Sequence, residues 1–356
     1  MMPEGATTPP RFQKILLTRL KFIGDVVLAT PVIRAMRTAY PDTRIAFLAE
    51  KEAASLLEHN PYLNEIIPLD FRKNVFSQLL FFKQLRHRRF DLVIDLFSNP
   101  RSSLLTYATG AKVRIGLEGR PRSRFYTHRI KDDGSPKTVI QSYFQFLRPL
   151  EIYPTSQKPE IFLTEDEQRE ASIYLHWQGI DINRPTVGLH PGASWPAKVW
   201  LSERFADLVD RIVAKLGAQV IITQGPKDRE IVAEVSRKCV ANVKVLDVLP
   251  LRQLAAILSH VTVYVANDSG PMHIAVAVGT KTIGIFGPGE ENIWFPYETA
   301  DGHRALRKDV WCHPCHLDFC DKVGDGYMKC MKLLDVEEVF KAVEDRLHSF
   351  SVDPDR

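Results

Sequence analysis

A late stretch of the chain places polar residues and a glycine where a buried strand is expected to give way to a helix. The residues that could do chemistry there are Asp268, Ser269, Gly270 and His273, within NDSGPMHIAVAVG. The preceding run VTVYVA has the apolar, β-branched composition of a buried strand, and Ser269 or Gly270 followed by Pro271 favours a helix start. The first N–H groups of a helix lack intrahelical partners and carry the positive end of its dipole. The stretch therefore predicts an anion-binding site, with phosphate as the expected ligand. Strand-turn-helix connections of this kind also occur without a ligand.

A second loop has the residue types that bind phosphate. In HPGASWPAKVW, which follows an expected strand at 186–190, Ala193 offers a backbone N–H, Ser194 a hydroxyl and Lys198 an ammonium group. These groups bind phosphate when they lie at the carboxyl end of a strand. The alternative for Lys198 is a solvated surface lysine.

Acids follow the next expected strand, at 219–223, in the loop QGPKDRE. Asp228 or Glu230 could accept hydrogen bonds from a ribose, as acids do beyond the second strand of nucleotide-binding sheets. Capping of the following helix is the alternative for Asp228.

Near the N-terminus, Gly24 and Asp25 in LKFIGDVVLATP stand where the expected strand 14–18 gives way to a helix. A carboxylate there could act as a general base toward an acceptor hydroxyl, or it could cap the helix and complement its dipole. A dinucleotide site would need GxGxxG, and this stretch has a single glycine. The stretch therefore argues against a nicotinamide-dependent dehydrogenase.

Strands and helices alternate in both halves of the chain, which would bring these loops to strand ends. The expected strands are 14–18, 44–48, 65–69 and 91–96 in the first half, and 186–190, 219–223, 243–246, 261–266 and 282–286 in the second. This pattern predicts an α/β fold of two Rossmann-like, doubly wound parallel sheets, joined by a linker with three prolines at 149–159. The expected parts are a disordered lead at 1–11, an N-terminal domain at 12–155, a C-terminal domain at 160–333 and an amphipathic helix at 335–349.

The composition is that of an ordinary soluble globular protein, with 356 residues, 45% apolar and 25% charged, and a net charge of +4. No apolar run approaches the roughly 20 residues that a membrane-spanning helix needs, and the first dozen residues lack the apolar core of a secretion signal. Five cysteines, an odd number, favour reduced thiols and a cytoplasmic protein.

Four of the cysteines form a cluster with the spacing C-x2-C-x4-C-x9-C, made of Cys312, Cys315, Cys320 and Cys330. This spacing could close a tetrahedral zinc site, and free thiols or a disulfide formed only on oxidation are the alternatives. Whether a metal binds is therefore left unknown. Cys239 is expected to be a core residue.

Taken together, LKFIGDVVLATP, HPGASWPAKVW, GPKDRE and NDSGPMHIAVAVG resemble glycosyltransferase family 9, the ADP-heptose:lipopolysaccharide heptosyltransferases, and in particular its heptosyltransferase II-like branch. The resemblance implies a GT-B fold, in which two Rossmann-like domains face each other across a cleft and the C-terminal domain holds the donor. It also implies an inverting, metal-independent reaction without a cofactor, with ADP-heptose as donor.

The resemblance also assigns roles to individual residues. Asp25 matches the family's catalytic base. The residues that match its donor site are Ala193, Ser194, Lys198, Asp228, Asp268, Ser269, Gly270 and His273.

The charge distribution fits an anionic acceptor. Residues 101–131 contain eight basic residues and one acid, Glu118. If the acceptor is the lipid A–core oligosaccharide, Arg120, Arg122 and Arg124 would bind its carboxylates and phosphates, and the same stretch would favour an anionic membrane surface. The protein would then work in the cytoplasm, at the inner face of the inner membrane.

Several alternatives stay open at this stage. The basic stretch could be a solvated loop, whereas nucleic acid is not expected because no nucleic-acid-binding module surrounds RPRSRF. The enzyme could transfer another sugar from a nucleotide donor, or the protein could bind a nucleotide sugar without catalysis.

Overall fold

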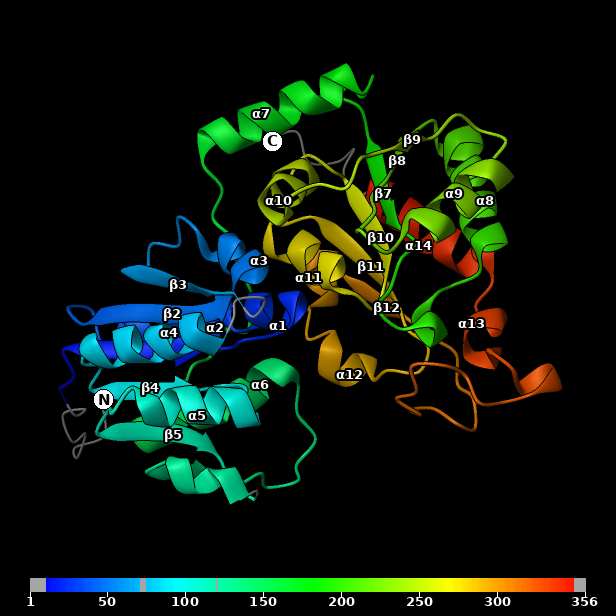
Figure 1. Ribbon diagram of the computed structural model, residues 1–356. Helices are drawn as coiled ribbons and strands as arrows, with labels where there is room; N and C mark the ends of the chain where they lie inside the picture. The colour runs from blue at the N-terminus through cyan, green and yellow to red at the C-terminus, as the bar shows by residue number, and fades with distance from the viewer. Residues whose placement is uncertain (1–10, 71–74, 120, 349–356) are drawn as a thin grey trace, which may run out of the picture. The chain divides into compact units, whose positions relative to one another are not determined.

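The computed structural model describes residues 11–70, 75–119 and 121–348, which fall into two compact units, an N-terminal unit (Met1–Pro159) and a C-terminal unit (Glu160–Arg356) (Figure 1). Arg120, residues 1–10 of the expected lead and residue 349 of the expected last helix lie outside the described residues.

The N-terminal unit contains a six-stranded parallel sheet in the order β3-β2-β1-β4-β5-β6. Its strands are β1 (Lys14–Thr18), β2 (Arg44–Glu50), β3 (Glu65–Leu69), β4 (Leu92–Asp95), β5 (Val113–Leu117) and β6 (His128–Ile130). Its α-helices are α1 (Ile23–Leu28), α2 (Thr30–Ala39), α3 (Lys51–Ala54), α4 (Val75–His87), α5 (Pro100–Ala108) and α6 (Val139–Phe144). Short 3-10 helices lie at Ser55–Leu57, Pro121–Phe125 and Gln145–Leu150.

The C-terminal unit repeats this scheme, with a second six-stranded parallel sheet in the order β12-β11-β10-β7-β8-β9. Its strands are β7 (Thr186–His190), β8 (Gln219–Ile222), β9 (Lys244–Val245), β10 (Val263–Asn267), β11 (Lys281–Ile285) and β12 (Arg304–Leu306). Its α-helices are α7 (Glu165–Trp177), α8 (Ser202–Arg211), α9 (Arg229–Lys238), α10 (Leu251–Leu258), α11 (Gly270–Ala277), α12 (Glu291–Trp294), α13 (Lys329–Leu333) and α14 (Val336–His348). A π-helix at Ile212–Leu216 extends α8, and 3-10 helices lie at Pro196–Lys198, Thr299–Asp301 and Gly324–Gly326.

In each sheet, the first strand of the unit lies at the centre and the chain adds strands first to one side and then to the other. This is the doubly wound order of Rossmann-like domains, which places ligand-binding loops at the carboxyl ends of the central strands. The central strands β1, β7 and β10 are buried along almost their whole length. Their near-continuous apolar sequences are typical of strands that are covered by helices on both faces.

The last helix, α14, belongs to the core of the C-terminal unit. Its residues Val339, Phe340 and Val343 are buried together with Val187 of β7 and Phe205 of α8. The amphipathic pattern at 335–349 therefore covers a face of the C-terminal sheet.

Two local expectations differ from the structure. The helix expected after the strand 14–18 is divided at Ala29 into α1 and α2, and Pro31 lies in the first turn of α2. The basic stretch 101–131 is not simply a solvated loop, because it contains most of α5 together with β5 and β6. These short strands are interrupted by arginine and glycine, so they lack the apolar alternation by which strands are recognised.

No helix in the described part of the chain is long and apolar enough to cross a membrane.

The close packing of β5 against a tyrosine ring gives a stability prediction. A Cβ at Gly116 would lie 2.2–2.4 Å from atoms of the Tyr126 ring, which is buried. We expect Gly116→Ala to lower the free energy of unfolding by about 1–3 kcal/mol, as overpacking of a core does. Urea unfolding measures this change. Gly326→Ala is the control, because its Cβ would meet only an ordinary contact at 3.4 Å, and equal stability of the two variants would contradict the prediction.

Candidate functional site

In the C-terminal unit, an ion pair lies directly after β10, between Lys198 Nζ and Asp268 Oδ2 at 2.6 Å. The two side chains are only 17% and 7% exposed. The ammonium group also lies over the Trp195 ring, 4.3 Å from its centroid. Lys198 is therefore not a solvated surface lysine, and that alternative is wrong.

The start of α11 lies beside this pair. Ser269 is the N-cap residue, with an extended backbone, but its hydroxyl makes no capping hydrogen bond. Ser269 Oγ is buried and has no hydrogen-bond partner among the residues that the structure describes. Since buried hydroxyls are normally paired, a polar ligand at this helix start would satisfy it. The free N–H groups of the first turn make an oxyanion the best match.

Asn267, which sequence reasoning passed over, connects β10 to the loop that carries Lys198. Its side chain is fully buried, accepts a hydrogen bond from the Trp200 N–H (3.2 Å) and donates one to the Pro191 carbonyl (2.8 Å). One amide thus holds both ends of the loop 191–200 against the end of β10. The signal in the sequence is the polar residue that ends the apolar strand before Asp268.

The other residues expected in this site lie on the same loops. Ser194 is exposed and Ala193 half-buried in the loop 191–200. His273 of α11 is buried, and its Nδ1 lies 2.5 Å from Tyr297 Oη. Burial, together with the nearby Asp268 carboxylate, raises the pKa of Tyr297 well above its ordinary value, so Tyr297 keeps its proton.

Asp228 lies after β8, and its side chain contacts the Gly225 backbone and the His190 ring. Its Oδ2 accepts a hydrogen bond from the Gly225 N–H (2.7 Å) and lies 3.5 Å from His190 Nε2. Asp228 is the N-cap residue of α9, as the capping alternative has it, but its side chain makes no capping hydrogen bond. A Cβ at Gly192 would lie 2.2–2.5 Å from the Asp228 carboxyl group, so glycine at 192 allows this close approach.

A third loop, after β11, contributes Gly289, which the sequence analysis did not single out. A Cβ at Gly289 would lie 2.8 Å from Asp268 Oδ2. Loops that follow β7, β10 and β11 therefore meet around the ion pair. The glycines of FGPGE directly after an expected strand were the available signal.

In the N-terminal unit, Asp25 lies in the first turn of α1 and is only 6% exposed. Its Oδ1 accepts hydrogen bonds from Arg19 Nη2 (2.5 Å) and Tyr143 Oη (2.9 Å). Its Oδ2 has a single long contact, 3.4 Å to the Phe22 N–H, among the described residues. One carboxylate oxygen is thus held by two hydrogen bonds, while the other has a single long one among the described residues.

Arg19 and Tyr143, neither of which was predicted, complete a closed triangle with Asp25. Arg19 Nε donates to Tyr143 Oη (2.9 Å), and its guanidinium lies 4.0 Å from the centroid of the Phe97 ring. Burial and the Asp25 carboxylate raise the pKa of Tyr143, which therefore remains a hydrogen-bond donor. Arg19 Nη1 is buried and unpaired within the described part of the chain, so it has a hydrogen bond to offer.

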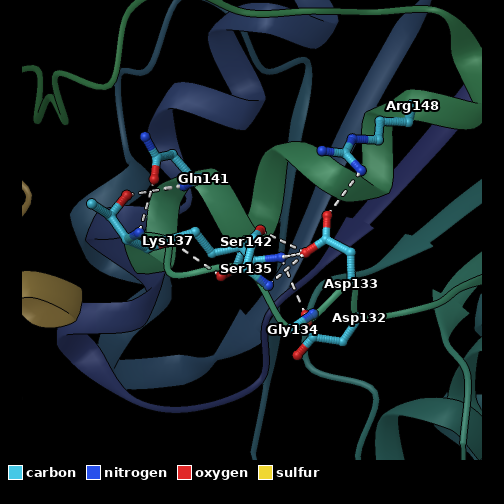
Figure 2. Close-up of polar contacts among 9 residues, drawn as sticks. Asp132, Asp133, Gly134, Ser135, Lys137, Gln141, Ser142 and Arg148 are labelled. Carbon is cyan, nitrogen blue, oxygen red and sulfur yellow. Dashed lines mark hydrogen bonds and ion pairs between the residues drawn. The ribbon is translucent and has the colours of Figure 1, made fainter.

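The helix that carries Tyr143 is anchored by an ionic turn (Figure 2). Asp133 accepts hydrogen bonds from Ser135 and Lys137 and lies 3.5 Å from Arg148, as Figure 2 shows. These interactions lower the pKa of the exposed Asp133 carboxyl, chiefly through Lys137 and Ser135. Thr138 then caps α6 by accepting a hydrogen bond from the Gln141 N–H (3.2 Å).

Of the three arginines expected to bind the acceptor, two are described. Arg122 is half-buried and donates through Nε to the Ser98 carbonyl (2.7 Å), whereas Arg124 is exposed and lies over the Phe125 ring. Nearby in the sequence, at the end of β4, Asp95 is fully buried and accepts a hydrogen bond from Tyr126 Oη (2.7 Å). Burial raises the pKa of Asp95.

The four clustered cysteines are free thiols, and all four line one small cavity. No group of three or more His, Cys, Asp or Glu side chains within residues 11–70, 75–119 and 121–348 is arranged to hold a metal ion. Cys239 lies half-buried at the edge of the C-terminal core.

Comparisons with known proteins agree with this architecture. A family model described as glycosyltransferase family 9 (heptosyltransferase) matches residues 79–321. The lipopolysaccharide core heptosyltransferase OpsX of Haemophilus influenzae is 29% identical, over 81% of this chain and 83% of that protein.

Solved structures show the same fold. E. coli ADP-heptose LPS heptosyltransferase II has a TM-score of 0.79 at 22% identity, covering 95% of this chain and 100% of that one. E. coli heptosyltransferase WaaC with ADP-2-deoxy-2-fluoro heptose has a TM-score of 0.70 at 17% identity, covering 93% and 99%.

Two Rossmann-like units of this kind define the GT-B fold. Since the family model covers more than half of the chain, the protein belongs to glycosyltransferase family 9, the heptosyltransferases. The predicted fold and family are confirmed, and the protein is a glycosyltransferase family 9 enzyme.

The Asn267 clamp can be tested by mutation. Asn267→Ala would leave the Pro191 carbonyl and the Trp200 N–H without their partner in a buried position. We expect a loss of about 2–3 kcal/mol in the free energy of unfolding, as for buried groups that lose their hydrogen bonds. Urea unfolding measures it, with Asn292→Ala at an exposed position as the control. An unchanged urea midpoint of unfolding would contradict the prediction, because water would then have replaced the amide as the hydrogen-bond partner of both backbone groups.

The buried imidazole of His190 gives a pH prediction. Burial lowers the pKa of His190 below its ordinary value of 6.5, although Asp228 opposes this shift. The unfolded chain therefore binds a proton that the folded chain resists, so stability is lost as pH falls below about 6.5.

We expect the unfolding temperature to fall less between about pH 7.5 and 5.5 in His190→Asn than in the unmodified protein, as this linkage requires. Calorimetry at several pH values measures it, with His87→Asn at an exposed site as control. Parallel pH profiles of the unmodified protein and His190→Asn would contradict the assignment.

Proposed function

We propose that this enzyme transfers heptose from ADP-L-glycero-D-manno-heptose to the inner core of lipopolysaccharide, with inversion and without a metal. The observation that carries the proposal is the half-buried Lys198 beside the start of α11, where Ser269 Oγ is buried and unpaired. A diphosphate leaving group gathers negative charge as the sugar departs, and a cation together with free N–H groups stabilises that charge. The E. coli relative that was solved with an ADP-heptose analogue supports this donor.

In the donor site, Asp268 sets the position of Lys198 rather than merely adding negative charge. Alone, Lys198 would be a partly buried, uncompensated cation, which is costly. Paired with Asp268 over the Trp195 ring, it stays charged and near α11, where a phosphate oxygen can share its three N–H donors. We assign the diphosphate to Lys198, Ser269, Gly270 and the loop with Ala193 and Ser194.

The ribose and sugar are assigned to the neighbouring acids and histidine. Asp228 would accept ribose hydroxyls only with the carboxylate oxygen that is not bound to the Gly225 N–H. His273, whose Nδ1 lies 2.5 Å from Tyr297 Oη, is assigned to the neighbourhood of the sugar.

Asp25 acts as the general base in this proposal. The acceptor hydroxyl must lose a proton as the glycosidic bond forms, and Asp25 Oδ2 is the oxygen that Arg19 and Tyr143 leave available. Arg19 Nη1, buried and unpaired within the described residues, would donate to an anionic oxygen of the acceptor. Arg120, Arg122 and Arg124 would bind further acidic groups of the lipid A–core oligosaccharide, at an anionic membrane surface in the cytoplasm.

The direct experiment supplies ADP-heptose and a heptose-deficient core acceptor, and follows ADP release and the mass of the product. Activity should persist in the presence of a metal chelator. Product formed only from another nucleotide sugar would redirect the proposal to that donor. ADP-heptose binding without turnover would favour a binding protein, and a preference for NAD over ADP and UDP would overturn the donor assignment.

Asp25→Asn tests the base. The amide can still accept hydrogen bonds from Arg19 and Tyr143 at Oδ1 but cannot take a proton. We expect turnover to fall at least about 100-fold, as loss of a general base does, while ADP affinity stays unchanged. Steady-state kinetics and calorimetric titration with ADP measure the two effects.

Asp42→Asn, at an exposed position of the same unit, is the matched control. Full activity of Asp25→Asn would rule out the base assignment. Loss of ADP binding in Asp25→Asn would mean that Asp25 contributes to donor binding instead.

A further inference from the structure

A buried carboxylate in the N-terminal unit, Asp95, has no part in the reaction proposed above. It ends β4, is fully buried and accepts hydrogen bonds with both of its oxygens. Asp95 lies opposite Thr18 in the parallel pairing of β4 with β1, and the Leu96 N–H donates to the Thr18 carbonyl (3.0 Å). The residue directly after Thr18 is Arg19, which forms the ion pair with Asp25. The buried carboxylate therefore lies at the strand end next to the one that leads into this pair.

One oxygen of Asp95 fixes the turn 95–98 that follows β4. Its Oδ1 accepts hydrogen bonds from the Phe97 N–H (3.1 Å) and the Ser98 N–H (2.9 Å). Ser98 has a φ of 50°, a left-handed conformation that costs free energy in a residue other than glycine and persists only where the surroundings hold it. The two hydrogen bonds to Asp95 supply part of that hold.

The same turn and the same carboxylate are also held from β5 and from the segment that follows it. Ser98 Oγ accepts a hydrogen bond from the Leu117 N–H (2.9 Å), and the Ser98 carbonyl accepts one from Arg122 Nε (2.7 Å). The second oxygen of Asp95, Oδ2, accepts a hydrogen bond from Tyr126 Oη (2.7 Å). The conformation of the turn is therefore fixed by contacts with separate parts of the N-terminal unit.

Phe97 connects this turn to the ion pair. Its side chain packs against the buried core cluster that includes Leu16 and Val93. The Arg19 guanidinium lies over the ring, with Cζ 4.0 Å from the ring centroid, where cation–π attraction is favourable. The position of the ring therefore limits where the guanidinium that donates to Asp25 Oδ1 can lie.

We propose that Asp95 is a positioning residue for the transfer reaction. By fixing the turn 95–98 it keeps the Phe97 ring against Arg19, and Arg19 in turn keeps the Asp25 carboxylate oriented. This role of Asp95 rests on the function of Asp25 as general base that is proposed above. Asp95 acts as a hydrogen-bond acceptor and exchanges no proton with the substrate.

The loss of this carboxylate would act on the reaction through the geometry of the base. The Phe97 and Ser98 N–H groups would lose their acceptor, which is costly for buried donors, so the turn would rearrange and the ring would move. Arg19 would then lose its ring contact. A misplacement of a reacting group by about 1 Å can lower a rate about 100-fold, so a small shift of Asp25 would be measurable.

The test measures steady-state transfer from ADP-heptose to a heptose-deficient core acceptor, and calorimetric titration with ADP, in variants of the full-length protein. We expect Asp95→Ala to lower turnover at least about tenfold while ADP affinity stays unchanged, as displacement of the base requires. Asp95→Asn should lose less turnover than Asp95→Ala, because its amide oxygen can still accept from the Phe97 and Ser98 N–H groups. Equal losses in these two variants would overturn the assignment of Asp95 as a hydrogen-bond acceptor.

Asp91→Asn is the matched control, because Asp91 directly precedes β4 and also accepts two backbone hydrogen bonds. They come from the Gln13 N–H (2.8 Å) and the Lys14 N–H (2.9 Å). Asp91→Asn should keep the turnover of the unmodified protein even where urea unfolding shows a loss of stability. A loss of turnover in Asp91→Asn as large as in Asp95→Ala would show a general structural effect and would overturn the proposal.

Phe97→Leu tests the connecting step, since it removes the ring and keeps an apolar side chain. We expect its turnover to fall as well. The double variant of Asp95→Ala and Phe97→Leu should lose no more than about twofold beyond the more severe single variant, because both changes act on the same contact. Losses that multiply in the double variant, or unchanged turnover in Phe97→Leu, would overturn the proposal.

Crystal structures of Asp95→Ala and Phe97→Leu give a readout that does not depend on activity. We expect the Arg19 guanidinium to be displaced from Asp25 in both, and an unchanged ion pair in both would overturn the proposal. If Asp95→Ala does not fold, Asp95→Asn and Phe97→Leu decide by the same comparison of single and double variants. Absence of turnover in the unmodified protein counts against the proposed function instead, and the crystal structures then decide the positioning role by themselves.

Discussion

The candidate site in the C-terminal unit depends on two hydrogen bonds made by the side chain of Asn267. They hold both ends of the loop 191–200 against the end of β10, and this loop carries Lys198. Without them, two backbone groups would be buried unpaired, and the position of the ammonium group would be set only by its contacts with Asp268 and Trp195. The same short stretch thus supplies the clamp, the counter-ion and the helix start, because consecutive residues at a strand end point in different directions.

The two units share one arrangement. In each, a charged side chain is partly buried and is fixed by an ion pair together with a hydrogen bond or a ring contact. Lys198 is held by Asp268 and the Trp195 ring, and Asp25 is held by Arg19 and Tyr143. Buried charges of this kind are costly unless they are paired, but pairing also fixes their geometry before a substrate arrives. Each cluster also contains one buried polar atom without a hydrogen-bond partner in the described structure. These atoms are Ser269 Oγ in the C-terminal unit and Arg19 Nη1 in the N-terminal unit.

The supporting elements explain why these positions are reproducible. Tyr143 reaches Asp25 from a helix whose start is anchored by the Asp133 turn and the Thr138 cap. Gly289 lies close to Asp268. Its loop is held by hydrogen bonds from His316 to the Pro288 carbonyl and from His313 to the Gly289 carbonyl. The loops around the Lys198–Asp268 ion pair are therefore connected to residues 313–318 by direct hydrogen bonds.

The sequence by itself determined the fold class, the family and the chain positions around which the site is built. Parallel strands read as apolar runs followed by turns, and a phosphate or acid-base site needs particular residue types at those turns, so Asp25, Lys198 and NDSG stood out. Only the tertiary structure decided which groups meet them. Arg19, Tyr143, Asn267 and Gly289 are ordinary residues in sequence, because their roles come from contacts with side chains or backbone that are distant along the chain. Likewise, spacing grouped the four cysteines, but only the fold brings them against Ala197 and Pro288, in the loops that follow β7 and β11.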